Sequence, residues 1–165
     1  MNGAAPLWRR PLDLVLAAFF VISVLYGLLF SLPEGLGVPV APDSPWPPLR
    51  SLHDWAVAQE PAHLDPPPVL IASCLFDGFF QAPTLVAVLY GLVVLPGWLR
   101  PLSLFYAGAA VTNMFFYFFQ TFFGPHPPPN LGTYLAFNLP WLFAPIVLAV
   151  RARAISPSTV PSGSR

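Results

Sequence analysis

The chain has 165 residues, of which 56% are hydrophobic, 15% are aromatic and only 8% are charged. Soluble globular domains carry about 25% charged residues, so the composition excludes that class. The formal net charge is zero, and no lysine-rich tract is present to neutralise phosphates, which leaves nucleic-acid binding without electrostatic support. These features predict a small integral membrane protein.

Four segments are long and apolar enough to cross a bilayer as helices, which requires about 17–25 residues. They cover residues 11–30, 69–95, 99–123 and 131–150. The first segment is longer than a signal peptide and lacks a typical cleavage site, so we interpret it as a permanent helix. The predicted fold is an all-α domain of four membrane-spanning helices over residues 1–153, followed by a disordered cytosolic tail at 154–165.

The positive charges indicate how these spans are oriented. Four spans would place most arginines on one side of the membrane, namely Arg9, Arg10, Arg100, Arg151 and Arg153. The opposite side would have Arg50 and most of the carboxylates. By the positive-inside rule, both termini are therefore predicted to be cytosolic.

The long loop between the first two spans contains a predicted amphipathic helix. Prolines at 45, 47, 48 and 66–68 cannot lie in a helix interior, but the segment 49–58 between them places its apolar side chains on one face. Together with Trp46 and Trp55, this helix is expected to lie at the membrane interface as a lid.

Asp77 points most directly to function, because it lies inside the second predicted span. A carboxylate in hydrocarbon costs roughly 2.5–3.5 kcal/mol on insertion scales, so such a residue usually has a partner and a function. Ser73 and Gln81 lie four residues to either side and share its helix face. Pro83 removes a backbone hydrogen bond and predicts a kink, which favours a pocket, with plain helix bending as the alternative.

The third and fourth spans contribute further candidate site residues. These are Thr112, Asn113 and Tyr117 in the third span, and Asn138 and Trp141 in the fourth. Polar side chains in a membrane turn inward, so we expect them to converge on Asp77. Taken singly, such amides and hydroxyls more often join helices as structural contacts. The ring of Tyr117 or Trp141 would suit contact with a cation.

The sequence predicts neither a metal site nor a cofactor. The histidines His53, His63 and His126 lie in predicted loops, and their positions do not have the spacing of metal ligands. Cys74 is interpreted as a small packed apolar residue of the second span.

The run from Asp77 to Pro83 resembles the acid–x–x–Phe–Gln–x–Pro segment in the second helix of the sigma-2 receptor. That receptor belongs to the EXPERA family, which also includes the emopamil-binding protein sterol isomerases. Further matches lie in the fourth span, at Asn138, Pro140, Trp141 and Pro145. The resemblance implies a four-helix fold in membranes of the endoplasmic reticulum type, with a cavity that takes sterols and hydrophobic amines. In it, Asp77 would be the acidic anchor and Gln81 would support it.

The sequence also departs from the family pattern. The receptor has a second acid late in its first helix where this chain has Ser31, and Glu34 follows Pro33, outside the predicted helix. The isomerases have a histidine where this chain has Ser73, and a glutamate where it has Ala109. A sterol isomerase needs one group to donate a proton and another to remove one. A single carboxylate within the membrane therefore does not favour isomerase chemistry.

The leading hypothesis is a membrane-embedded binding or trafficking protein for sterols or related hydrophobic ligands, anchored by Asp77. As a neutral acid Asp77 would donate a hydrogen bond to a sterol hydroxyl, and as a carboxylate it would pair with an amine. The alternative is an isomerase or cyclase for a sterol or isoprenoid, with Asp77 as the proton donor. Expected partners are membrane lipids and the ligand, and a second copy or another membrane protein is a further candidate. The basic retrieval tail of the receptor is absent, so location in the endoplasmic reticulum follows from the resemblance alone.

Overall fold

The computed structural model describes residues 6–38 and 47–153, apart from the side chain of Leu49. In these residues the regular structure is helical. Four segments have the length and hydropathy of a membrane span, and they are Pro11–Gly35, Pro68–Val94, Leu99–Phe123 and Leu131–Arg153. The chain is therefore an all-α integral membrane protein with four spans, as the sequence predicts. The predicted tail at 154–165 and Trp46 lie outside the described residues.

Two of the spans are interrupted by a π-helical turn. The first span comprises α1 (Pro11–Tyr26), the π-turn η2 (Gly27–Ser31) and α2 (Leu32–Gly35). The second comprises α4 (Pro68–Phe76), the π-turn η4 (Asp77–Gln81) and α5 (Ala82–Val94). The third span is α6 (Leu99–Phe123) and the fourth is α7 (Leu131–Arg153). The remaining elements are the 3-10 turn η1 (Leu7–Arg9), the loop helix α3 (Pro47–Gln59) and the 3-10 turn η3 (Pro61–Leu64).

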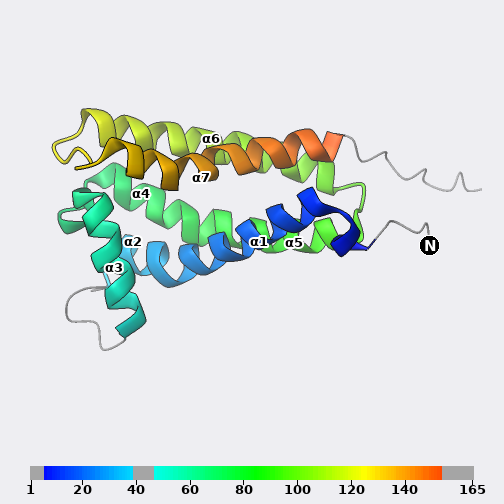
Figure 1. Ribbon diagram of the computed structural model, residues 1–165, viewed down its shortest axis with the longest axis horizontal. Coiled ribbons are helices and arrows are strands. Elements are labelled where there is room, and N and C mark those ends of the chain that lie inside the picture. Colours follow the sequence, from blue (N-terminus) through cyan, green and yellow to red (C-terminus); the bar gives the residue numbers. More distant parts are fainter. Residues whose placement is uncertain (1–5, 39–46, 154–165) are drawn as a thin grey trace, which may run out of the picture.

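The spans associate as two antiparallel pairs (Figure 1), in which α6 packs against α7 and α1 against α5. At the end of the bundle near α3, α4 contacts both α2 and α6 and so joins the two pairs. The helix α3 lies across this end, where the sequence predicted a lid. The first residues of α1 and the last residues of α7 lie together at the opposite end of the bundle.

The first span is longer than the sequence predicted. It was expected to end at residue 30, with Glu34 in the following loop, but the helix continues to Gly35 and includes Glu34. The reason lies in η2, where the N–H of Leu32 bonds to the carbonyl of Gly27 in a wider π-type turn. Pro33 then stands at the start of α2, a position where the helix loses nothing from its missing N–H.

The two π-turns lie against each other and position Asp77. Pro83 follows η4 just as Pro33 follows η2, so the irregularity predicted at Pro83 takes the form of a π-turn. At Gly27 a Cβ atom would lie only 3.1 Å from the main-chain oxygen of Asp77, so the two turns pack more closely than most side chains would allow. Because π-turns in helices occur frequently at functional sites, this contact directs attention to Asp77.

The close-packed core occupies the half of the bundle farther from α3. It is built from apolar side chains of α1, α5, α6 and α7, among them Leu16, Phe20, Leu85, Val88, Leu92, Leu99, Tyr106 and Leu148. Many large apolar side chains elsewhere are exposed, as expected of helices whose outer faces meet lipid. Dense packing in one half leaves the half beneath α3 available for a cavity.

A buried ion cluster closes the end of the bundle opposite α3. Asp13 of α1 has no exposed surface, although the sequence singled out only Asp77 as an acid within a span. The Nη1 of Arg10 donates to Oδ2 of Asp13 at 3.0 Å, and Nε of Arg151 donates to its Oδ1 at 2.9 Å. Arg10 also donates to the main-chain oxygen of Leu92 at 2.6 Å. The cluster thereby joins α1, α5 and α7.

Candidate functional site

A cavity with a volume of about 540 Å³ lies between α3 and the half of the bundle beneath it. All four spans and α3 contribute to its walls, which are mainly apolar and aromatic, as at Phe19, Phe30, Leu70, Trp55 and Trp141. Binding sites for small molecules in proteins have volumes of about 300–1,000 Å³ and are largely apolar with a few polar groups. The cavity therefore has the size and character of a site for a hydrophobic ligand.

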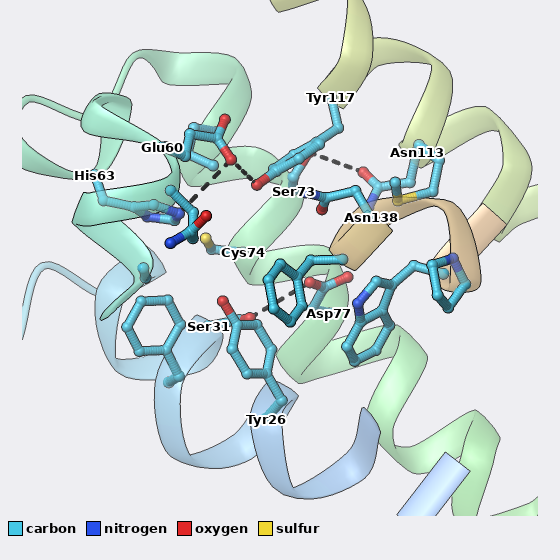
Figure 2. Close-up of a pocket in the computed structure, with 18 of the residues that line it drawn as sticks. Tyr26, Ser31, Glu60, His63, Ser73, Cys74, Asp77, Asn113, Tyr117 and Asn138 are labelled. Atoms are coloured by element: carbon cyan, nitrogen blue, oxygen red, sulfur yellow. Dashed lines mark hydrogen bonds and ion pairs between the residues drawn. The ribbon is translucent and has the colours of Figure 1, made fainter. Parts of the chain in front are cut away.

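Asp77 lines this cavity from the π-turn η4. Its Oδ2 accepts a hydrogen bond of 3.4 Å from the hydroxyl of Ser31. Figure 2 shows Ser31 and Asp77 facing each other from the two π-turns. Asp77 is only partly buried by protein, because its carboxyl faces the open cavity. Such a group is free to bind a ligand.

Most of the side chains predicted to converge on Asp77 also line the cavity. They are Ser73, Gln81, Asn113, Tyr117, Asn138 and Trp141. Gln81 remains on the face of Asp77 because a π-turn, at slightly more than four residues per turn, still brings residue i+4 close to residue i. The indole of Trp141 packs against the rings of Phe19 and Tyr26, with centroid distances of 5.0 and 5.7 Å.

The amides and hydroxyls among these residues are partly engaged with one another. The hydroxyl of Ser73 donates to Oδ1 of Asn113 at 3.0 Å, which joins α4 to α6. The Nδ2 of Asn138 donates to the main-chain oxygen of Tyr134 one turn earlier, also at 3.0 Å. These bonds hold polar groups at the cavity wall, where each keeps further hydrogen-bonding capacity.

Thr112 is the predicted site residue that the structure does not bring to the cavity. It is exposed on the outer face of α6, and its hydroxyl donates to the main-chain oxygen of Gly108 at 2.8 Å. Successive residues of an α-helix point about 100° apart, so Thr112 and Asn113 face different surroundings. Thr112 borders a shallow groove between α4 and α6, together with Phe76 and Phe105.

A second group of polar residues, which the sequence did not single out, lies where η3 meets the cavity (Figure 2). The side chains of Glu60 and His63 are only 3% and 5% exposed, and both residues line the cavity. Glu60 accepts hydrogen bonds from the hydroxyl of Tyr117 and from that of Thr121, the latter at 2.8 Å. The Nδ1 of His63 lies 2.6 Å from Oε1 of Glu34, whose side chain is 7% exposed.

These contacts correct two predictions, namely that Asp77 is the single carboxylate within the membrane and that His63 lies in a loop. The cavity region has more than one buried carboxylate, since Glu34 and Glu60 accompany Asp77, and His63 is a buried residue of a 3-10 turn rather than of an open loop. No local pattern in the sequence marks them. Their burial depends on the segment 47–64 folding back across the end of the bundle, and on α2 continuing through Pro33.

A comparison with models of protein families identifies the family of this chain. The model of EXPERA, the expanded EBP superfamily, matches residues 46–152. The matched segment begins next to α3 and runs almost to the end of α7, so it includes Glu60, His63, Asp77 and the cavity residues of α6 and α7. No curated protein and no solved structure matches the chain. Because the family model covers more than half of its length, the chain belongs to the EXPERA family.

Proposed function

We propose that the protein binds a sterol or a related hydrophobic ligand within the membrane and holds the polar group of that ligand at Asp77. The observation that carries the proposal is an apolar cavity with a carboxyl group on its wall whose hydrogen bond among the described residues is a long one, 3.4 Å from Ser31. Membership of a membrane family supports a ligand that partitions into lipid. Trafficking of such a ligand is part of the proposal, as is location in the endoplasmic reticulum with cytosolic termini.

The site suits two kinds of polar group. A hydrophobic amine would form a charge-assisted hydrogen bond with the carboxylate of Asp77, worth about 1.5–3 kcal/mol. The rings of Tyr26 and Trp141 line the same cavity and would add cation–π attraction. A sterol hydroxyl would instead bond to Asp77 and Ser31 as both donor and acceptor. The charged amine forms a stronger hydrogen bond with the carboxylate than a hydroxyl does, so a cationic amphiphile is the better probe.

We expect Asp77→Asn to weaken binding of dodecylamine by about tenfold or more, since losing 1.4 kcal/mol changes a dissociation constant tenfold. Asparagine has nearly the same shape, so folding should be preserved. The measurement is isothermal titration in detergent with the purified protein, and thermal unfolding checks the fold. The matched control is Asp54→Asn, because the side chain of Asp54 on α3 is 68% exposed. Equal affinity in Asp77→Asn and the wild type would rule out the anchoring role.

A second candidate function is an isomerase or cyclase for a sterol or isoprenoid, and one observation favours it. Glu60 and His63 line the same cavity as Asp77, so the groups that donate and remove protons need not be a single residue. Incubation of the purified protein with Δ8-sterols and other isoprenoids, followed by mass spectrometry, tests this function. Turnover that disappears in Asp77→Ala would establish the enzymatic function. Substrates that remain unchanged would contradict it and leave ligand binding as the function.

A further inference from the structure

The cavity has a second polar region, at its end near α3. Glu60 precedes η3 and His63 lies within it, and both reach the cavity while remaining almost fully buried in protein. Gln59 and Tyr117 line the cavity beside them. Buried polar groups in proteins are normally hydrogen-bonded, so atoms left with open capacity at a cavity wall indicate where a ligand would bond.

Hydrogen bonds within the protein orient Glu60 and His63 but leave part of their hydrogen-bonding capacity unused. Glu34 holds the Nδ1 side of the His63 ring at 2.6 Å, while Nε2 of the ring lies 3.9 Å from Oε2 of Glu60. That separation exceeds a hydrogen bond, so the two atoms are neighbours without being bonded. A hydroxyl group has one hydrogen to donate and also accepts. When Nε2 of His63 has a proton, the hydroxyl accepts from Nε2 and donates to Glu60, and when only Nδ1 has one, the hydroxyl donates to either Nε2 or Glu60.

This second region lies well away from Asp77 along the bundle. Glu60 bonds to Tyr117 and Thr121 of α6, whereas Ser73, one turn before Asp77, bonds to Asn113 of the same helix. At 1.5 Å of rise per residue, these offsets place Asp77 and Glu60 on the order of 10–15 Å apart. The wall between them is mainly apolar and includes Phe30 and Leu70.

We propose that Glu60 and His63 form a second polar subsite of this cavity, so that the preferred ligand is a hydrophobic molecule with a polar group at each end. An amine or hydroxyl at one end binds Asp77, and a hydroxyl at the other end bonds between Glu60 and His63. The inference rests on the proposed function, because it assigns the second end of the ligand that Asp77 anchors.

A comparison of two ligand series tests the subsite, because the subsite determines whether a terminal hydroxyl on the ligand strengthens or weakens binding. The first series is n-alkylamines, and the second is amino alcohols of the same chain lengths with a hydroxyl at the far end. In an apolar cavity the added hydroxyl would weaken binding, because it leaves water without finding a partner. At the chain length that spans the two regions, we expect the hydroxyl to tighten binding about tenfold instead. A site with buried hydrogen-bonding groups favours a ligand with the hydroxyl over the analogue that lacks it.

Two variants connect that gain to the residues. His63→Gln keeps a hydrogen-bonding group for Glu34 but removes the ring, and Glu60→Gln removes the charge and replaces one acceptor oxygen with a donor. The gain from the hydroxyl is expected to disappear in His63→Gln and to shrink in Glu60→Gln. The matched control is Asp65→Asn, an exposed acid just after η3, in which the gain should be unchanged. The comparison of the two series in the wild type requires no variant to fold.

Failure of the subsite can be distinguished from failure of the proposed function. If alkylamines bind and lose affinity in Asp77→Asn, but the hydroxyl weakens binding at every chain length, the subsite is wrong and the anchor stands. A gain that persists in both His63→Gln and Glu60→Gln also overturns the subsite. If alkylamine affinity does not depend on Asp77, the proposed function fails, and if neither series binds, both proposals fail.

Discussion

Replacing Glu60 by alanine is expected to detach α3 and η3 from α6. The carboxylate accepts hydrogen bonds from Tyr117 and Thr121, and hydrogen bonds to charged groups contribute about 1.5–3 kcal/mol each. Thr121 can turn to the main-chain oxygen of Tyr117, which lies 3.0 Å away, but the hydroxyl of Tyr117 would lose its acceptor. The free energy of unfolding should therefore fall by about 2–4 kcal/mol.

Hydrogen exchange over residues 47–64, together with thermal unfolding in detergent, measures this effect. Exchange in α3 and η3 should accelerate more than exchange in α1 or α5, because the lost contacts attach the loop segment specifically. Glu60→Gln serves as the conservative comparison, since its amide oxygen still accepts one of the two bonds. Unaltered protection of residues 47–64 in Glu60→Ala would show that these bonds do not hold the segment in place.

Replacing Asp13 by alanine is expected to destabilise the opposite end of the bundle by about 3 kcal/mol or more, the range measured when one partner of a buried ion pair is removed. Asp13 is fully buried, and its two partners, Arg10 and Arg151, are 11% and 24% exposed. Without the carboxylate, two guanidinium groups would face each other with their charges uncompensated. The ends of α1 and α7 should separate.

Thermal unfolding of Asp13→Ala beside Asp54→Ala isolates this effect, because Asp54 is an exposed acid on α3 and its carboxylate lies 3.9 Å from His53, farther than a hydrogen bond. Ligand binding in Asp13→Ala should persist at temperatures where the variant is folded, since the ion cluster lies at the end away from the cavity. A Tm equal to that of Asp54→Ala would contradict the role of the cluster in joining the helices.

Hydropathy alone predicted the four spans, because a bilayer permits few other ways of satisfying the backbone. Helical spacing then placed Ser73 and Gln81 beside Asp77, and Asn138 beside Trp141, on faces that the structure turns toward the cavity. These inferences depend on periodicity within one helix, which a sequence displays directly.

The remaining features depend on contacts between distant segments or on local irregularities. The length of the first span was misjudged because Pro33 normally ends a helix, and nothing in the sequence revealed that the π-turn η2 would admit it. Glu60 and His63 become buried only when η3 folds under α3 against α6. Thr112 and Asn113 were both predicted to face the site, but only Asn113 lines the cavity, because the rotation of α6 about its axis is not determined by the polarity of its side chains.

A structure of the protein determined experimentally with dodecylamine bound is the most direct measurement of ligand anchoring at Asp77. We expect the ammonium nitrogen within about 2.7–3.2 Å of a carboxylate oxygen of Asp77, the distance of a hydrogen bond. The alkyl chain should extend through the cavity toward Glu60 and His63. Ligand density in the outer groove beside Thr112, with none next to Asp77, would contradict the anchoring of ligands by Asp77.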